Sequence, residues 1–285
     1  MNSRINERAI IDYYENCQID YEIVWHLNSK MCMHYGYWEE NTPNLRTALS
    51  LMNQKVAEFG SLKKGDKVLD AGCGVGGSSI YLARHFDCKP TGISLSDKQI
   101  EKCRENAEKH GVANLCTFDQ QNYLETPYPD HTFDVVWAIE SVCYAFDKLD
   151  FLKEAYRILK PGGRLVVADF FVNEMEADSD QAVLVKKWTE TWAIQAYANK
   201  DKFYQQMNDA GFVDLKKKDI SKNVLKTIRR LFYAFLPGIV ITSISQALGF
   251  RNRLQTANTW STYYQYQAYK MGLWSYMFFS ARKPT

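Results

Sequence analysis

The chain has little net charge of either sign. Its 285 residues include 35 lysines and arginines against 33 aspartates and glutamates, a formal net charge of +2 at pH 7. Nucleic-acid binding relies on concentrated positive charge, so the composition predicts no nucleic-acid partner. The N-terminal residues contain no apolar run of the kind found in a signal peptide. With 46% hydrophobic and 24% charged residues, the composition is that of an ordinary globular protein.

The seven cysteines do not have the paired spacing of a metal site or of a disulfide framework. They are dispersed along the chain at positions 17, 32, 73, 88, 103, 116 and 143. An odd, scattered set favours reduced thiols and a cytoplasmic location, and it predicts no metal site.

Long hydrophobic runs are also scarce. One mostly apolar stretch, 231–250, approaches the roughly 20 residues that span a bilayer. Pro237 and Gly238 interrupt it and polar residues dilute it, which disfavours a membrane-spanning helix. Because 222–270 is long for a connection, we expect two short helices here that cover a ligand site as a lid. Peripheral membrane contact through 223–253 and a hydrophobic dimer face are the alternatives.

Strands and helices alternate between residues 67 and 171, which is typical of a parallel α/β sheet. Strands are predicted at 67–70, 89–93, 115–118, 133–138 and 164–170, and helices at 77–86, 97–110 and 148–160. Helices at 181–198 and 201–210 follow, with further strands near 211–215 and 273–282. The sequence therefore predicts a Rossmann-like fold, with a seven-stranded, mostly parallel sheet and helices on both faces.

A glycine-rich run, Asp-Ala-Gly-Cys-Gly-Val-Gly-Gly at 70–77, follows the first strand. Glycine allows a backbone to approach a ligand closely, so the turn predicts a cradle for a nucleotide-like molecule. Its spacing also fits the dinucleotide fingerprint, which requires an acidic residue at the end of the next strand. That strand ends in Ser94 and Leu95, which disfavours a nicotinamide cofactor. Asp70, immediately before Ala-Gly-Cys-Gly, instead resembles the pattern of class I S-adenosylmethionine methyltransferases.

Four segments resemble class I S-adenosylmethionine-dependent small-molecule methyltransferases. They are VLDAGCGVGG at 68–77, TGISLSDKQI at 91–100, FDVVWAIES at 133–141 and RILKPGGRLVVADF at 157–170. The group resembled contains sterol C-methyltransferases, γ-tocopherol methyltransferases and rebeccamycin-type sugar O-methyltransferases. The resemblance implies S-adenosylmethionine as cofactor, with S-adenosylhomocysteine as its product. It also implies three parts, which are a helical and aromatic substrate-access segment (1–60), a cofactor-binding core (61–171) and a helical lid with the last two strands (172–285).

The resemblance assigns cofactor contacts to the loops that follow successive strands. The residues implied are Asp70, Gly72, Cys73, Gly74, Ser94, Leu95, Gln99, Gln121, Asn122, Ala138 and Ile139. Asp70 would bind the amino-acid end of the cofactor, and Ser94 with Gln99 the ribose. Asn122 would accept a hydrogen bond from the adenine amine, where many relatives have an aspartate.

Three residues are candidates for the chemistry at the acceptor. Glu140 follows the fourth strand, where related enzymes have a glutamate that faces the methyl group; a structural carboxylate is the alternative reading. Tyr144 stands where O-methylating relatives have a histidine. His34, in the access segment, is therefore the candidate base of that kind.

Aromatic residues are plentiful, with 18 Tyr, 15 Phe and 7 Trp. We expect an apolar acceptor pocket lined by Tyr21, Trp25, Tyr35, Trp38 and Trp192. Attack of an alkene on a methyl group leaves a carbocation, which aromatic faces stabilise. The rings and Glu140 therefore favour carbon methylation of an isoprenoid-like acceptor such as a prenyl compound, sterol or quinone. Two alternatives are O- or N-methylation of a natural product or lipid head group, and cofactor binding without transferase activity.

Overall fold

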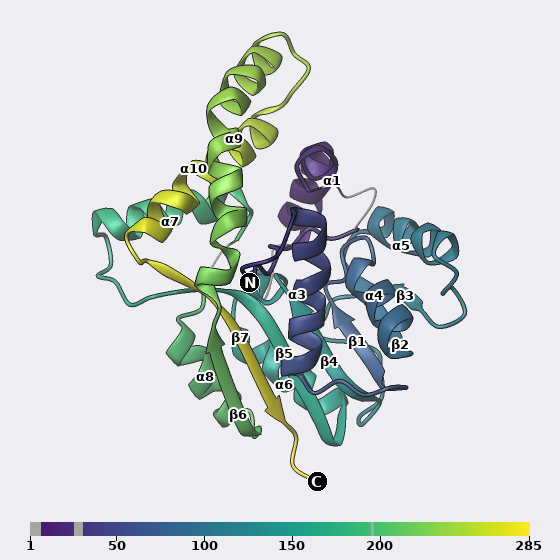
Figure 1. Cartoon of the computed structure of the whole chain (residues 1–285). Coiled ribbons are helices and arrows are strands. Elements are labelled where there is room, and N and C mark those ends of the chain that lie inside the picture. The colour runs from purple at the N-terminus through teal and green to yellow at the C-terminus, as the bar shows by residue number, and fades with distance from the viewer. Residues whose placement is uncertain (1–6, 26–30, 195–196) are drawn as a thin grey trace.

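A seven-stranded sheet forms the centre of the computed structural model, which describes residues 7–25, 31–194 and 197–285 (Figure 1). The strands are β1 (Lys67–Ala71), β2 (Lys89–Ser94), β3 (Thr117–Gln120), β4 (Phe133–Ile139), β5 (Leu159–Val172), β6 (Val213–Asp219) and β7 (Trp274–Arg282). Their order is β3-β2-β1-β4-β5-β7-β6, and β7 runs antiparallel to both of its neighbours. The predicted seven-stranded, mostly parallel sheet is confirmed.

Helices cover both faces of this sheet. Those described are α1 (Glu7–Val24), α3 (Leu45–Phe59), α4 (Gly77–Phe86), α5 (Asp97–Lys109), α6 (Lys148–Ile158), α7 (Asp180–Thr191), α8 (Lys200–Asp209), α9 (Ser221–Ala247) and α10 (Arg253–Lys270), with a 3-10 turn at Val142–Tyr144. Apolar residues of α3 and α9 pack on one face, whereas those of α6 and α8 pack on the other. The predicted helices on both faces are therefore present.

The central strands are apolar on both sides, which is the reason for their near-continuous hydrophobic sequence. In β4, Val135 and Trp137 belong to the core beneath α3, while Val136 and Ala138 belong to the core beneath α6. Successive side chains of a strand point to opposite faces, so both layers pack against the same strand. The polar loops that follow the strands are left at one edge of the sheet.

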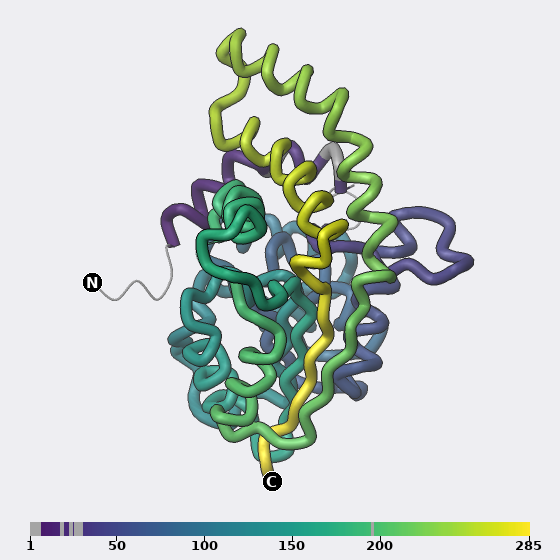
Figure 2. Tube along the Cα trace, turned by 90° about the vertical axis from the view of Figure 1, so that its left-hand side faces the viewer, coloured from purple at the N-terminus to yellow at the C-terminus, as the bar shows by residue number. Residues whose placement is uncertain are grey.

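A helical hairpin connects β6 to β7 at that edge. Figures 1 and 2 show α9 and α10 side by side, rising beyond the rest of the molecule. The expected break at Pro237 is absent, because Pro237 lies inside α9, a continuous helix of 27 residues. Proline removes one backbone hydrogen bond, and packing supports the helix there, since the Phe235 ring lies 5.0 Å from that of Trp260. No helix in the described ranges combines the length and hydropathy needed to cross a membrane.

Strands β3 and β6 each begin two residues later than predicted, and two other boundaries differ by more. β5 begins at Leu159 rather than 164, because Leu159 pairs with Phe133 and the chain stays in the sheet through the Pro-Gly-Gly turn. The helix predicted at 181–198 ends at Thr191, and Asn199 then forms a bridge with Val172. In both places pairing between distant residues overrides the local pattern.

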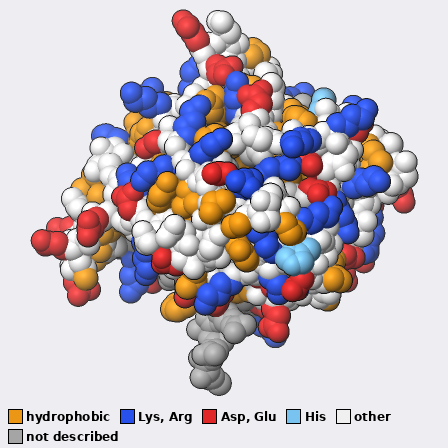
Figure 3. Space-filling model, turned by 90° about the horizontal axis from the view of Figure 1, so that it is seen from below, with side chains coloured by type: hydrophobic (Ala, Val, Ile, Leu, Met, Phe, Trp, Pro, Cys, Tyr) orange, Lys and Arg blue, Asp and Glu red, His pale blue; other side chains and the backbone are white. Residues whose placement is uncertain are grey.

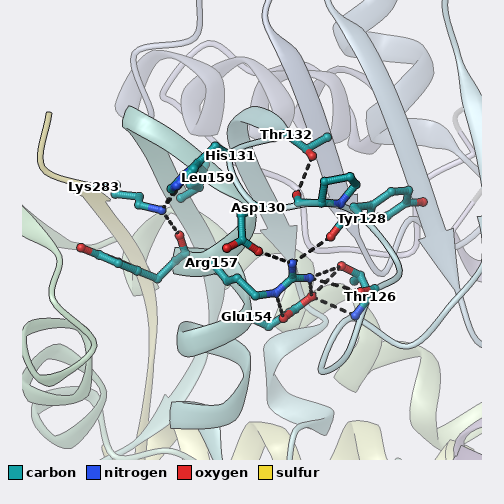
Figure 4. A network of polar contacts seen from close by, with 11 residues as sticks. Thr126, Tyr128, Asp130, His131, Thr132, Glu154, Arg157, Leu159 and Lys283 are labelled. Carbon is teal, nitrogen blue, oxygen red and sulfur yellow. Dashed lines mark hydrogen bonds and ion pairs between the residues drawn. The ribbon is translucent and has the colours of Figure 1, made fainter.

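The edge opposite the hairpin is fastened by the polar network of Figure 4. The Arg157 guanidinium donates to Glu154 (2.9 Å), to Asp130 (2.7 Å) and to the carbonyl of Tyr128 (2.8 Å). The Lys283 ammonium donates to the carbonyl of Leu159 (2.9 Å). Because these residues precede β4 and β5 or follow β7, the network ties α6 to the amino edge of the sheet. Arg157, the first residue of the matching segment at 157–170, therefore has a structural role.

Candidate active site

A cavity of about 360 Å³ lies at the carboxyl edge of the sheet. The loops after β1, β2, β3 and β4 line one part of it, and α1, α9 and α10 line the other. Open α/β sheets bind ligands outside the carboxyl ends of their strands, where the loops meet. The cavity thus has a polar end, near the glycine run, and a mostly apolar end under the hairpin.

The glycines after β1 are required by close contacts. Gly72 has a φ of 94°, and a Cβ there would lie 2.4 Å from the Cβ of Ser141. Gly74 has a φ of 53°, and a Cβ there would lie 2.7 Å from the Met33 side chain. A side chain at either position would both strain the backbone and collide with a neighbour. The loop, including Cys73, forms a wall of the cavity.

Asp70 is buried at the end of β1 and lines the same wall. Its carboxylate accepts a hydrogen bond of 2.6 Å from the hydroxyl of Ser79, on α4. Burial raises the pKa of Asp70 to about 6, and the bond from Ser79 works in the opposite direction. A buried carboxylate with one internal partner suits a ligand that brings donors or positive charge.

The ends of β2 and β3 supply further polar groups. The Ser94 hydroxyl donates to Gln99 Oε1 at 2.7 Å, and Ser94, Leu95, Gln99 and Gln121 all line the cavity. Asn122 does not line it, although the sequence placed this residue against the adenine. Its Oδ1 accepts from the backbone of Leu124 (2.9 Å), and its amide donates to Glu7 (2.7 Å). Of the two neighbouring amide residues after β3, Gln121 is therefore the one that lines the cavity.

Tyr123, which the sequence did not single out, also lines this part of the cavity. Its hydroxyl donates to the Ser141 carbonyl at 2.8 Å. Of the two residues predicted at the end of β4, Ile139 lines the cavity, whereas the Ala138 side chain packs into the core beneath α6. Any contact by Ala138 with a ligand is left to its backbone.

Glu140 lines the cavity between the glycine run and the rings, since the next residue, Ser141, lies against Gly72 and Glu140 itself is bonded to Tyr35. Its φ is 50°, a left-handed conformation that is uncommon for a residue other than glycine. One carboxylate oxygen, Oε1, accepts from the Tyr35 backbone and from the Tyr276 hydroxyl, both at 2.7 Å. Burial raises the pKa of Glu140 to about 8, although both hydrogen bonds lower it. A carboxyl group with this pKa is a far stronger base than a glutamate in water.

The other two candidate catalytic residues have internal partners. The Tyr144 hydroxyl lies 3.0 Å from that of Tyr14, and burial raises its pKa well above the ordinary value. His34 Nδ1 donates to the Tyr35 carbonyl at 2.9 Å, and Nε2 accepts from Asn53 at 3.3 Å. Burial lowers the pKa of His34 to about 4. Both residues line the cavity, but Tyr144 stays protonated and His34 is a weaker base than Glu140.

Four of the five aromatic residues expected around an acceptor line the cavity, namely Tyr21, Trp25, Tyr35 and Trp192. Trp38 lies outside it, because its indole donates to Thr227 of α9 at 2.8 Å and Lys226 lies over its ring. Besides Tyr123, the sequence analysis missed three rings that do line the cavity: Tyr14, Phe170 and Phe235. Their spacing along the chain is that of ordinary core positions, so no local signal distinguished them.

An ion pair joins α1 to the hairpin at the apolar end. Arg251 makes two hydrogen bonds to the Asp20 carboxylate, at 2.8 and 3.0 Å, and Asn258 donates to the same group at 3.0 Å. Asp20, Arg251 and Asn258 all line the cavity. The sequence analysis missed this cluster because its residues are more than 200 positions apart.

The fold and this site define a class I S-adenosylmethionine-dependent methyltransferase. A family model described as a methyltransferase domain matches residues 62–229, and the chain belongs to this family. The polar end of the cavity fits the cofactor, because it combines a cradle that a Cβ would fill with a buried carboxylate and hydroxyl and amide groups. The protein is accordingly an enzyme that methylates small molecules with S-adenosylmethionine.

Two relatives illustrate the range of sequence similarity. The chain is 34% identical over 194 residues to 27-O-demethylrifamycin SV methyltransferase of Amycolatopsis mediterranei (strain S699), which covers 67% of this chain and 70% of that protein. It is 29% identical over 279 residues to Methyltransferase GfsG of Streptomyces halstedii, covering 97% and 95%.

Solved structures share the fold over nearly the whole chain. The [4+2]-cyclase SpnF matches with a TM-score of 0.79 at 23% identity, covering 97% of this chain and 95% of that one. Geranyl diphosphate methyltransferase in complex with GPP and sinefungin matches with a TM-score of 0.75 at 20% identity, covering 97% and 98%. At these identities the similarity shows the fold alone.

Proposed function

We propose that the enzyme methylates a carbon atom of a hydrophobic, isoprenoid-like acceptor, with Glu140 as the group that accepts the proton. The observation that carries this proposal is the position of Glu140, a buried base between the glycine loop and the ring-lined end of the cavity. Among the described residues, His34 is the one histidine that lines the cavity, and both its ring nitrogens are bonded within the protein. A histidine-assisted O-methylation therefore has weak support.

The polar end of the cavity is the proposed cofactor site. S-adenosylmethionine supplies an electrophilic methyl group on a positively charged sulfur. In this proposal Asp70 binds the amino-acid portion, and Ser94 with Gln99 binds the ribose hydroxyls. Gln121 takes the adenine contact that the sequence analysis gave to Asn122, because Gln121 lines the cavity.

The apolar end of the cavity is the proposed acceptor site. Its rings include Tyr14, Tyr21, Trp25, Phe170 and Trp192, and α9 adds Leu231 and Phe235. Such a surface excludes water and orients an apolar molecule. If the acceptor is an alkene, aromatic faces also stabilise the carbocation that forms when the double bond attacks the methyl group.

The proposed role of Glu140 is to take the proton that the methylated acceptor must lose. Both hydrogen bonds that it receives from other described residues end on Oε1, which leaves Oε2 to accept that proton. The same two bonds hold the carboxyl group in place, so its position does not depend on the ligand. General-base catalysis by a positioned group contributes about 10² to 10⁴ in rate.

Carbon and oxygen methylation are distinguished by the product. We expect incubation with methyl-labelled S-adenosylmethionine and a panel of prenyl, sterol and quinone acceptors to give a product with a new labelled C–CH₃ group, identified by NMR. Reactions without acceptor measure background S-adenosylhomocysteine formation. A label on oxygen would reject carbon methylation and support O-methylation. That second candidate is favoured by the 34% identity to a protein named as an O-demethylrifamycin methyltransferase.

The raised pKa of Glu140 predicts a distinctive pH dependence. Only the ionised carboxylate accepts a proton, and the pKa rises from 4.5 to about 8. We therefore expect kcat/KM to increase about tenfold per pH unit up to pH 8 and then to level off. Steady-state kinetics between pH 6 and pH 9.5 would measure this, with cofactor affinity followed over the same range. A profile that is flat from pH 6 to pH 8 would contradict the role of Glu140 as base.

A further inference from the structure

We propose that the tip of the α9–α10 hairpin docks on the surface of an anionic lipid bilayer. The first observation is the concentration of exposed apolar side chains at this tip. Nine of the thirteen large hydrophobic side chains that are exposed in the described part of the chain lie between residues 233 and 260. They are Tyr233, Leu236, Val240, Ile241, Ile244, Leu248, Phe250, Leu254 and Trp260. Phe250, in the connection between the helices, is 81% exposed.

These side chains form a stripe along α9 rather than a scatter. Leu236, Val240, Ile244 and Leu248 follow one another at four-residue spacing, which keeps them on one side of a helix. The buried residues of the same helix, such as Leu231, Phe235 and Thr242, lie on the other side. α9 therefore has two apolar faces, and the described part of the chain covers only one of them. Soluble proteins leave such an apolar patch exposed mainly where something binds.

The charges around the stripe indicate what binds. Residues 220–285 contain no aspartate or glutamate, although the whole chain has 33. Exposed Arg253 lies at the tip of the hairpin, and exposed Lys222, Lys226 and Arg229 lie in the first turns of α9, before the stripe begins. Exposed apolar residues beside basic residues, with no acidic ones, match the interface of a bilayer that contains anionic lipids. By contrast, Figure 3 shows positive and negative side chains mixed over the opposite end of the molecule.

The shape of the hairpin favours a bilayer over a second copy of this chain. In both Figure 1 and Figure 2 the hairpin projects beyond the body of the protein as a narrow ridge. Two copies that met through this stripe would bring their basic residues together without acidic partners, which opposes association. A projecting apolar ridge can instead insert among lipid head groups, with Arg253 at its tip near the phosphates.

The docking surface is continuous with the cavity. Ile241 is 63% exposed and also lines the cavity, and Ala234 and Gly238 of the same helix line it too. If the acceptor is hydrophobic, as proposed above, it can pass from the bilayer along α9 without crossing water. This last step rests on the proposed function, whereas docking itself does not.

Co-sedimentation of the whole protein with vesicles tests the docking. We expect binding to vesicles of phosphatidylcholine with 30% phosphatidylglycerol, and weaker binding to phosphatidylcholine alone. The double variant Leu236→Gln/Ile244→Gln should lower the partition coefficient at least tenfold, because it removes two inserted side chains that do not line the cavity. Arg253→Gln or 0.5 M salt should weaken binding only to the anionic vesicles.

The matched control is the double variant Val183→Gln/Met271→Gln, which removes two exposed apolar side chains outside the tip. It should bind vesicles like the unmodified protein, and calorimetric titration with S-adenosylmethionine checks that each variant is folded. Absence of binding to anionic vesicles would reject the proposal, as would equal losses in the two double variants. A concentration-dependent dimer in sedimentation velocity that Leu236→Gln/Ile244→Gln dissociates would assign the stripe to a second copy instead. None of these measurements needs an acceptor, so failure of the proposed function would leave them interpretable.

Discussion

Replacing Glu140 with glutamine is expected to lower kcat by at least about a hundredfold, while the affinity for S-adenosylmethionine stays within a few-fold. Glutamine has the same shape, and its amide oxygen can still accept from Tyr35 and Tyr276, but it cannot take up a proton. The loss corresponds to removal of a general base, which contributes about 10² to 10⁴ in rate. Single-turnover kinetics with labelled cofactor, together with calorimetric titration, would measure both quantities.

Asp169 provides a matched control for this variant. It is also a buried carboxylate with a raised pKa (about 7), but it accepts from the backbone of Cys143 and Phe170 and does not line the cavity. Asp169→Asn should lower the melting temperature, because one of those two bonds is lost, and leave kcat within a few-fold. If Glu140→Gln retains more than a third of the kcat of the unmodified enzyme, the glutamate is structural.

The pH dependence of stability tests the raised pKa of Glu140 independently of activity. Because burial raises the pKa of Glu140 to about 8, folding favours its protonated form. The contribution of Glu140 to the free energy of unfolding is therefore complete below about pH 4.5 and is lost as the pH rises towards 8. Glu140→Gln cannot ionise, so its melting temperature relative to the unmodified protein should increase between pH 5 and pH 8.5.

Replacing Gly72 with alanine is expected to have the second large effect. The added Cβ would lie 2.4 Å from the Cβ of Ser141, on a backbone with a φ of 94°. A left-handed conformation costs a residue with a side chain about 1–2 kcal/mol, and overpacking adds about 1–3 kcal/mol. For a chain of this size these costs correspond to a fall of about 5–15 °C in melting temperature. Cofactor affinity should also fall at least tenfold, because the loop that must shift lines the cavity.

Gly111→Ala separates the two causes. Gly111 also has a positive φ, of 69°, but no atom lies within 4 Å of an added Cβ. Calorimetry should therefore show a smaller fall in melting temperature, and titration should show unchanged cofactor affinity. Equal losses of stability and affinity in the two variants would mean that the contact with Ser141 is unimportant.

The polar end of the cavity, which is the proposed cofactor site, was readable from the sequence because its residues are local. Each contributing loop directly follows a strand, and parallel strands bring their carboxyl ends to one edge of the sheet. Asp70, Gly72, Ser94 and Gln121 were placed by this rule, and all of them line the cavity. The rule failed at Asn122 because the direction of a side chain within a loop depends on its own bonds, here with Leu124 and Glu7.

The acceptor end depended on tertiary structure, since its residues come from helices far apart in the chain. His34 is a weak base because burial lowers its pKa to about 4, and its bonds to Tyr35 and Asn53 occupy both ring nitrogens. The Asp20–Arg251 pair joins α1 to the hairpin across more than 200 residues. Neither relation leaves a local pattern in the sequence.

The sequence by itself determined the parallel sheet, the glycine cradle and hence the methyl donor, because strand periodicity and turn chemistry act over a few residues. Tertiary structure alone decided which rings line the cavity, and that α9 stays helical through Pro237 with an exposed apolar side. A helical pattern of apolar residues does not show which face of the helix will be buried against the protein. Only the packing of α9 against α10 and the sheet separates its buried face from its exposed one.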